Sequence, residues 1–462
     1  MNKKLITTVA MSLGIFLVML DTTIMNIALP AIQKGLAVEF TQLSWALNIY
    51  TIIFATLTIP LSKLGDIFGR NKIYLLGLIF FASGSFLSGI APAFSLLIIG
   101  RIISSIGAAI ILPLGNTIGI SAWKMSDRFK IIAILGLTQG GAAAVGPTLG
   151  GILTDLLSWH WIFLTNIPIV LIAIFLSMTA LTFKENTEKI KIDFLGSSIS
   201  MLALFSLTLA LIKVREWGIL NFKSVICFTA SLLLGILFIQ VERKAKAPMI
   251  DLALFKIRSF TTSVIVALVA QFFYIGVVVI LPTYLTNALQ DTELQAALIL
   301  LPMSLTVFAF GGLGSLAINK LGPRLLIFIG LLSILLSYVL LVLTGTIGTF
   351  YLSLSILALG IGFGIIAGPI NILAASNLNG TLLTSSQSVI SVVRQIGSVL
   401  GVSIFASLMS ANLNQASINN SLSLKQAYLS IYSGWIPVLV VLLLLTFAYP
   451  TKKNYQSGLK GY

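Results

Sequence analysis

Residues 325–344 read LLIFIGLLSILLSYVLLVLT, twenty consecutive residues without a charged side chain. A helix of that length rises about 30 Å, at roughly 1.5 Å per residue, which matches the hydrocarbon core of a bilayer. We therefore predict that this stretch spans a membrane. Thirteen further stretches have a similar length and composition. Ten precede the quoted one and three follow it, at residues 6–30, 44–62, 73–92, 94–119, 131–154, 161–183, 194–212, 222–241, 260–284, 294–318, 349–373, 386–410 and 427–449. The predicted fold class is an all-α integral membrane protein with 14 transmembrane helices.

The composition of the whole chain agrees with that prediction. Of 462 residues, 58% are apolar and only 9% are charged, and the mean hydropathy is +1.07. A soluble chain carries about 25% charged residues, and it needs them to cover its surface. Soluble enzymes and soluble nucleic-acid binders are therefore excluded.

The positive charges predict how the chain is oriented. The net charge is +15, and the basic residues lie between the apolar stretches, so the expected anionic partner is the lipid headgroup layer and not nucleic acid. With both termini inside, 21 of the 28 Lys and Arg residues fall in inner segments and 5 in outer loops, while two lie within spans. Lys and Arg are retained on the cytoplasmic side. We expect a multi-pass protein of the cytoplasmic membrane with both termini in the cytoplasm.

Several kinds of chemistry are excluded by residue counts. Cys227 and His160 are the one cysteine and the one histidine, so an internal disulfide and a histidine-rich metal site are impossible. No phosphate-binding G-x-x-x-x-G-K-[ST] motif is present, so ATP would have to be bound by a separate protein. The spans contain no catalytic His, Cys or paired carboxylate. We expect no enzymatic activity, no metal and no cofactor.

The chain contains a short internal repeat. Residues 62–70 read SKLGDIFGR and residues 315–324 read SLAINKLGPR, with Ser, Asp or Asn, and Gly in corresponding positions 253 residues apart. Two six-helix halves joined by an inserted helix pair would give this offset, and parallel repeats are a known transporter architecture. The predicted units are residues 1–185, the inserted pair at 186–245, and residues 246–462.

Three charged residues lie well inside apolar spans: Asp21, Arg101 and Arg394. A charge at mid-membrane costs roughly 2.5–3.5 kcal/mol on insertion scales, so each calls for a partner or a function. Counting residues from the outer ends of their spans places Asp21 and Arg101 at a similar depth, roughly 10–14 Å. An ion pair between them is therefore possible. Asp21 is either a proton acceptor whose charge switches during transport or one member of a static ion pair.

Two further motifs concern helix packing and the inner surface. The span at 131–154 contains GPTLGG, with Gly146, Pro147, Gly150 and Gly151, and such residues allow close approach and bending of membrane helices. This segment is suited to sliding against a neighbour, or else it forms a fixed crossing.

In the loop LGDIFGRNK, Asp66 precedes Gly69 and Arg70. This loop is either an inner gate held by ion pairs and helix capping or a solvated turn.

Taken together, these motifs resemble the fourteen-span drug:proton antiporter branch of the major facilitator superfamily over nearly the whole chain. The segment LDTTIMNIALP at 20–30 is similar to the first-span signature, the Asp66 loop to the inner-loop motif, and GPTLGG to the exporter motif. WHWIFLTNIP from Trp159 and RQIG from Arg394 also fit. The resemblance implies proton-driven export, with Asp21 and Arg101 in coupling roles. Ser104 and Ser105 replace the usual Gln and Gly after the arginine, and Ser62 replaces the first Gly of the inner loop.

We accordingly expect an alternating-access antiporter, acting as a monomer, that exports amphipathic small molecules in exchange for protons. Candidate residues of the substrate cavity are Gln139, Gln271, Tyr274 and Arg394. With one buried carboxylate against two arginines, we expect neutral, zwitterionic or anionic substrates to be handled better than dications. The alternatives are an uptake symporter or a lipid or metabolite exporter on the same scaffold, and the membrane subunit of an ATP-driven pump or a channel.

Overall fold

In the computed structural model, all regular structure in the described residues is helical. The structure describes residues 3–38, 40–183, 193–245, 248–346, 350–375, 378–415 and 421–446. The α-helices are α1 (Lys3–Leu36), α2 (Phe40–Phe68), α3 (Arg70–Gly89), α4 (Phe94–Ser121), α5 (Arg128–Leu156), α6 (Trp161–Leu164), α7 (Asn166–Ala180), α8 (Phe194–Trp217), α9 (Phe222–Lys244), α10 (Arg258–Ala288), α11 (Glu293–Leu321), α12 (Pro323–Thr346), α13 (Phe350–Ala375), α14 (Gly380–Gln415), α15 (Ser421–Leu429) and α16 (Ile436–Leu445). Three short 3₁₀ segments are Met125–Asp127, Leu252–Lys256 and Ser430–Trp435.

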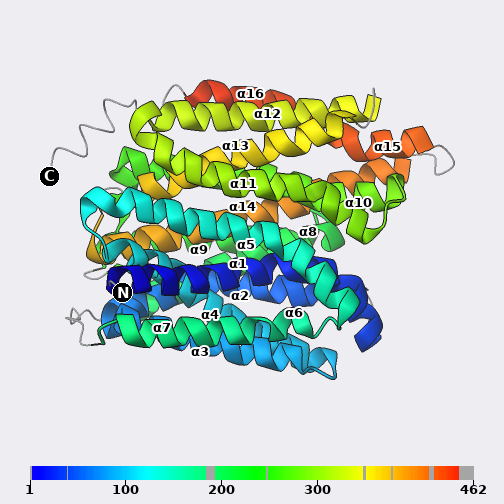
Figure 1. The fold of residues 1–462 in the computed structure, drawn as a ribbon. Coiled ribbons are helices and arrows are strands. Elements are labelled where there is room, and N and C mark those ends of the chain that lie inside the picture. Colours follow the sequence, from blue (N-terminus) through cyan, green and yellow to red (C-terminus); the bar gives the residue numbers. More distant parts are fainter. Residues whose placement is uncertain are drawn as a thin grey trace.

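Most of these helices are long enough to cross a bilayer and run side by side (Figure 1). Within the described residues, 13 segments have the length and apolar composition of a membrane span. One predicted span, at 131–154, is not among those 13 segments. It lies in α5, which is 29 residues long. The count of 14 therefore stays a prediction.

Two predicted spans are interrupted. The span at 161–183 is divided into α6 and α7 at Thr165, and the span at 427–449 is divided into α15, a 3₁₀ segment and α16. Pro168 lies in the first turn of α7 and Pro437 in the first turn of α16. Proline is accepted there because the amide hydrogens of a first turn have no partner within the helix.

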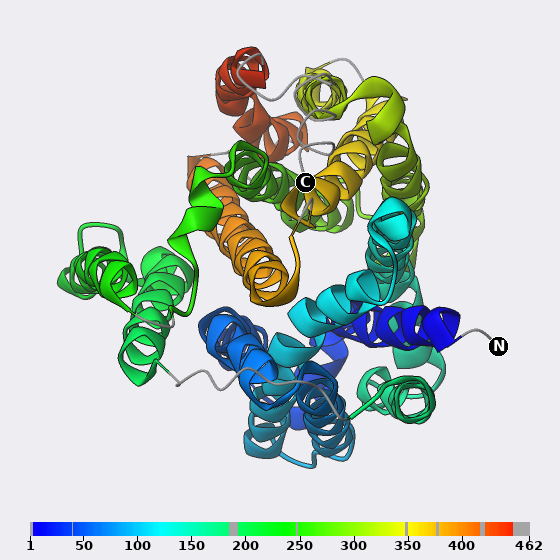
Figure 2. The ribbon, with the colours of Figure 1, turned by 90° about the vertical axis from the view of Figure 1, so that its left-hand side faces the viewer.

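Seen along the helices, the molecule is two bundles with a helix pair at one side (Figure 2). The first bundle holds α1–α7 and the second α10–α16; we call them the N half and the C half. α2 packs on α14 and α5 packs on α11, so these four helices form most of the contact between the halves, and α4 and α13 add to it against α14 and α5. The predicted boundaries near residues 185 and 246 lie outside the described residues, and the division at those residues stays a prediction.

The inserted pair contacts both halves through α8. Lys213 lies 4.5 Å from the centre of the Trp45 ring on α2, and the Ser403 hydroxyl on α14 donates to the carbonyl of Leu211. α9 packs on α8, and most of its surface is exposed, including Leu232 and Leu233. This exposure is the expected result for a helix with one protein neighbour in a membrane.

The internal repeat has a counterpart in the backbone. Gly69 follows α2 with φ 104° and ψ 123°, and Gly322 follows α11 with φ 83° and ψ 158°. The two residues are separated by the same 253 positions as the sequence repeat. Residues with a side chain rarely adopt such positive φ values. Glycine at both places therefore makes the same tight turn into the next helix.

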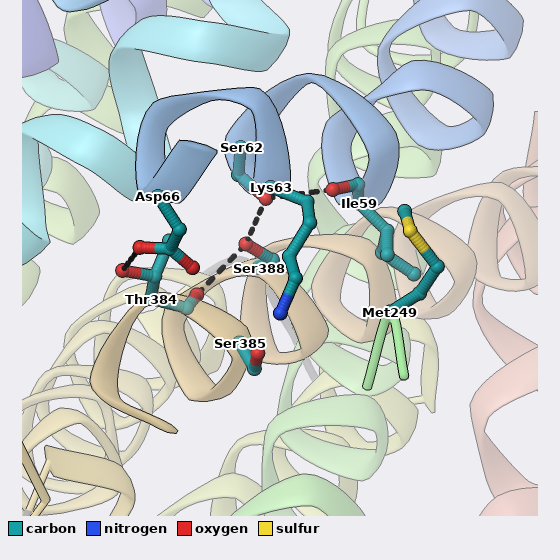
Figure 3. Close-up of a pocket in the computed structure, with 8 residues that line it drawn as sticks. All are labelled: Ile59, Ser62, Lys63, Asp66, Met249, Thr384, Ser385 and Ser388. Carbon is teal, nitrogen blue, oxygen red and sulfur yellow. Dashed lines mark hydrogen bonds between the residues drawn. The ribbon is translucent and has the colours of Figure 1, made fainter. Parts of the chain in front are cut away.

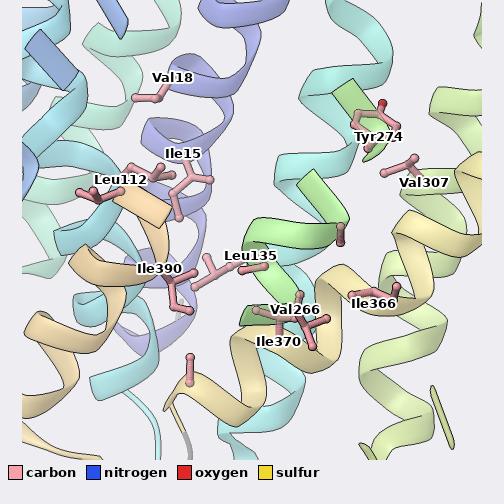
Figure 4. Close-up of a cluster of buried hydrophobic side chains, with 14 of the residues drawn as sticks. Ile15, Val18, Leu112, Leu135, Val266, Tyr274, Val307, Ile366, Ile370 and Ile390 are labelled. Carbon is pink, nitrogen blue, oxygen red and sulfur yellow. The ribbon is translucent and has the colours of Figure 1, made fainter. Parts of the chain in front are cut away.

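A continuous apolar cluster joins the two halves (Figure 4). Ile15 and Val18 of α1 pack with residues of α4 on one side, and Ile366 and Ile370 of α13 lie on the other. Leu135 of α5 and Ile390 of α14 lie between them. Polar groups that lie along this interface are therefore surrounded by apolar side chains, which strengthens their electrostatic interactions.

Candidate functional site: a buried ion pair and the contact between the halves

Asp21 and Arg101 form an ion pair inside the N half. An Nη1 hydrogen of Arg101 is donated to Oδ2 of Asp21 over 2.7 Å. The two residues are 0% and 1% exposed. Depth counting thus placed them at compatible heights on α1 and α4.

Arg101 has further partners besides the carboxylate. Its Nε donates to the carbonyl of Ala46 over 3.4 Å, and its Cζ lies 4.2 Å from the centre of the Tyr50 ring and 5.8 Å from that of Phe163. Aromatic faces attract a guanidinium, and more strongly where water is excluded. Arg101 therefore keeps favourable contacts when the charge of Asp21 is removed.

The second oxygen of Asp21 has no such partner. Among the described atoms, Oδ1 of Asp21 and the hydroxyl of Tyr50 are both buried without a hydrogen bond of normal geometry, although the two side chains lie near enough to interact with each other. An unpaired buried carboxylate oxygen is costly, since it loses water and gains nothing in return. A proton added at Oδ1 would remove the buried negative charge, and the Tyr50 hydroxyl, which interacts with the Asp21 side chain, is available to accept a hydrogen bond from it. Sequence reasoning missed Tyr50 because an aromatic residue in an apolar span resembles ordinary packing.

The exporter-motif glycines bring α5 against α1 close to this pair. A Cβ atom added to Gly146 would lie 2.0 Å from Oγ1 of Thr23, and one added to Gly150 would lie 2.9 Å from the carbonyl oxygen of Ile24. Gly151 is half-buried, and the side chain of Pro147 lies outside the described residues. Since Thr23 and Ile24 follow Asp21 within one turn, a shift of α5 acts directly on the segment that carries the carboxylate.

At the end where α2 ends and α14 begins, polar side chains hold the halves together. We call it the inner end, after the predicted orientation. Oδ1 of Asp66 accepts from Nε and Nη2 of Arg70, over 2.8 and 2.7 Å, and from the hydroxyl of Thr384 on α14 over 3.0 Å. The hydroxyl oxygens of Ser62 and Ser388 lie 2.6 Å apart. Asp66 is thus both the predicted partner of Arg70 and a direct bond to the other half.

A small pocket lies beside these contacts (Figure 3). Lys63 of α2 extends between Met249 and Ser385. The Asp66 side chain points away from Lys63 and toward Thr384. Arg128 at the start of α5 adds two bonds between the halves, from Nη1 to the carbonyl of Leu378 over 2.9 Å and from Nη2 to Oδ1 of Asn379 over 2.8 Å. Partial burial lowers the pKa of Arg128 from its ordinary value, but an arginine remains charged in proteins.

The four predicted cavity residues are brought together only in part. Nη1 of Arg394 donates to Oε1 of Gln139 over 3.0 Å, from the C half to the N half. Nη2 of Arg394 donates to Oδ1 of Asn371 over 3.1 Å and to the carbonyl of Ala367 over 3.4 Å. Gln271 donates to Ser398, one turn along α14 from Arg394, over 2.9 Å.

Tyr274 stacks on Phe363, with ring centres 4.1 Å apart and planes inclined by 15°. Asn371 and Phe363 were not predicted. The polar residue inside the apolar span at 349–373 was the available signal for Asn371.

Two bundles of membrane-length helices, a buried ion pair in one of them and a polar contact between them define the class of a multi-pass membrane transporter. The Major Facilitator Superfamily matches residues 11–402 of the chain, and the protein belongs to that family. Membership confirms the family predicted from the motifs, and its members are transporters.

Similar proteins agree with this assignment. The chain is 30% identical over 417 residues to "Multidrug resistance protein 3" of Bacillus subtilis, covering 89% of this chain and 80% of that protein. It is 28% identical over 416 residues to "Riboflavin transporter RibZ" of Clostridioides difficile, covering 89% and 90%. The human organic anion transporter MFSD10 (TETRAN) has the same fold, with a TM-score of 0.69 and 15% identity, over 96% of this chain and all of that one.

Proposed function

We propose that the protein is a proton-coupled antiporter that exports amphipathic small molecules by alternating access. The observation that carries the proposal is the Asp21 carboxylate, fully buried with one oxygen paired to Arg101 and the other without a partner. When it is protonated, the group is neutral and its O–H can donate to the Tyr50 hydroxyl, and when it is not protonated, it forms the ion pair with Arg101. Multidrug resistance relatives support the export of drugs.

In the proposed cycle, the state with a closed inner end holds the charged Asp21–Arg101 pair. A proton that enters from outside neutralises Asp21, and Arg101 then relies on Ala46 and the Tyr50 ring. The weaker hold between α1 and α4 favours the state that is open to the cytoplasm. Substrate binding there favours loss of the proton and the return, as linkage between the two ligands requires. The setting is the cytoplasmic membrane with both termini inside, and no cofactor takes part.

A second candidate is proton-coupled uptake of a nutrient, because one relative is named a riboflavin transporter. Both candidates use the same buried carboxylate, but the direction of proton movement relative to substrate differs. In antiport, substrate and protons move in opposite directions; in symport they move together.

Proteoliposomes with an internal pH-sensitive dye separate these candidates. Purified protein is reconstituted without ATP and exposed to a pulse of rhodamine 123, pyrenebutyrate or riboflavin, while the internal pH is followed. We expect substrate entry to release protons from the vesicle interior, and this change of internal pH to vanish when a protonophore lets protons equilibrate across the membrane. Internal acidification that accompanies substrate entry would replace antiport by symport.

Engineered cysteines test whether the inner end opens during the cycle. The variant Ser62→Cys/Ser388→Cys, made with Cys227→Ser, places two thiols where hydroxyl oxygens are 2.6 Å apart, which is near enough for a disulfide. Oxidation is expected to reduce transport to background, and a reductant to restore it. The matched control is Ser337→Cys/Ser355→Cys, a pair with hydroxyl oxygens 3.0 Å apart within the C half, where crosslinking should leave transport intact. Full transport with the first pair crosslinked would contradict a moving inner gate.

A further inference from the structure

Arg394 is a cation inside an apolar interface, and its observed partners are neutral. Its bonds go to an amide oxygen of Gln139, an amide oxygen of Asn371 and a backbone carbonyl. The sequence contains no Asp or Glu after Glu293, and no ion pair to Arg394 occurs among the described residues. This differs from Arg101 and Arg70, which each have a carboxylate within 2.7 Å.

The absence of an acidic partner has an energetic consequence. A guanidinium in an apolar environment is stabilised most by a carboxylate or another anion, which forms short charge-assisted bonds in a paired geometry. Neutral amide oxygens compensate the lost hydration only in part. Arg394 therefore favours an incoming anion over an incoming cation or neutral molecule.

An aromatic pair lies one helical turn from a carbonyl that Arg394 contacts. Phe363 is half-buried and stacked on Tyr274, and it precedes Ala367, whose carbonyl accepts from Arg394, by one helical turn on α13. One turn of helix rises about 5.4 Å. A planar aromatic molecule with an anionic group at roughly this distance from its ring matches both features.

The hydrogen bond between Arg394 and Gln139 links substrate binding to the contact between the halves. Gln139 belongs to α5 of the N half, and its Oε1 accepts a hydrogen bond from Nη1 of Arg394 across the contact between the halves. An anion that takes that donor displaces Gln139 and breaks this bond between the halves. Binding of the substrate anion and the loss of this bond between the halves would then be one event.

We propose that Arg394, with Asn371 and the Tyr274–Phe363 pair, is a binding site for planar aromatic anions, and that the substrate anion replaces Gln139 as the partner of Arg394. This inference rests on the proposed transport function and names its substrate class. Gln139 is then a competitor of the substrate, so its removal and its conversion to an acid have opposite effects.

The test uses two probes with the same aromatic ring and chain length, pyrenebutyrate, which ends in a carboxylate, and the neutral pyrenebutanol, which ends in a hydroxyl. Their affinities are measured by pyrene fluorescence on the purified protein in nanodiscs, with the signal of empty discs subtracted. No pH gradient is present, so a failure of proton coupling leaves the result unaffected. We expect the wild-type protein to bind pyrenebutyrate at least about tenfold more tightly, a preference equal to roughly 1.4 kcal/mol.

Variants at the two ends of the bond give opposite predictions. Gln139→Glu supplies a permanent carboxylate to Arg394 and is expected to remove the preference for the anion. Gln139→Met removes the competing acceptor and should tighten pyrenebutyrate by about two- to tenfold, the range that one hydrogen bond accounts for. Arg394→Gln should make the two probes bind alike, whereas Arg394→Lys should keep part of the preference.

Two results would overturn the proposal: equal affinities of the wild-type protein for both probes, or an unchanged preference in Arg394→Gln. Weaker anion binding in both Gln139 variants would assign Gln139 a structural role and would also reject the displacement. Melting temperatures of all variants show whether each is folded, and Arg394→Lys remains informative if Arg394→Gln is not. Proton flux in proteoliposomes is measured separately, so loss of coupling with retained anion preference would reject the antiport cycle alone.

Discussion

Asp21→Asn is expected to reduce gradient-driven efflux to the level of cells without the protein, while the variant still folds and inserts. Asparagine has the shape of the carboxylate and keeps an oxygen for Nη1 of Arg101, but it cannot take up or release a proton. The ion pair of 2.7 Å becomes an ordinary hydrogen bond. The protein is then held in the electrostatic condition of the protonated state, and the pH gradient has no group on which to act.

Two measurements separate this outcome from simple damage. Efflux is followed in energised cells with matched expression, and exchange of labelled for unlabelled substrate is followed in vesicles without a gradient. We expect exchange to survive in Asp21→Asn, because it requires movement of the loaded protein but no net proton transfer. The control Asp155→Asn removes an exposed carboxylate near the C-terminal end of α5 and should retain wild-type efflux. Gradient-dependent efflux by Asp21→Asn would exclude Asp21 as the proton carrier.

The ion pair of Asp21 and Arg101 was predictable because it depends on two simple regularities. Charges are rare inside apolar spans, so Asp21 and Arg101 stand out in the sequence. The constant rise of a helix then converts residue counts into depth. Both regularities apply to helices of one half, and α1 and α4 pack on each other within the N half.

Contacts between the halves were not predictable in the same way. Gln139 and Arg394 were each candidates, but their hydrogen bond spans 255 positions of sequence, and its existence depends on how two separate bundles meet. The bonds of Asp66 to Thr384 and of Ser62 to Ser388 are of the same kind. Serine and threonine in an apolar helix usually bond to their own backbone, so the run at 384–388 carried no specific signal.

Helix interruptions were missed for a further reason. Hydropathy reports how much of a segment is apolar on average, and Trp161–Ala180, which holds α6 and α7, has a high mean hydropathy of 2.2. The break at Thr165 depends on local backbone geometry before Pro168. The GPTLGG motif, by contrast, carried a signal for close helix approach, and a Cβ atom added to Gly146 or Gly150 would lie within 3.5 Å of the backbone of Ile24.

Removal of the arginine is expected to have the largest effect on stability. Arg101→Met leaves Asp21 buried without a cation, in surroundings where Oδ1 already has no partner. Breaking a buried pair by removing one member costs about 3–5 kcal/mol, because the remaining charge is uncompensated. Asp21→Asn should cost less than Arg101→Met, since Arg101 retains the Ala46 carbonyl and the Tyr50 ring.

The double variant Asp21→Asn/Arg101→Met shows whether this reasoning about charge is correct. With both charges removed, no uncompensated group remains, and apolar replacement of a buried pair is often close to neutral. We expect the double variant to be more stable than Arg101→Met alone, with an interaction energy between the two sites of about 2 kcal/mol or more, measured by denaturant unfolding in detergent. Additive losses would mean that Asp21 and Arg101 stabilise the fold independently, and that neutralising Asp21 does not alter the hold between α1 and α4. The proposed cycle requires that hold to depend on the charge of Asp21, so the same measurement of stability also tests the mechanism of coupling.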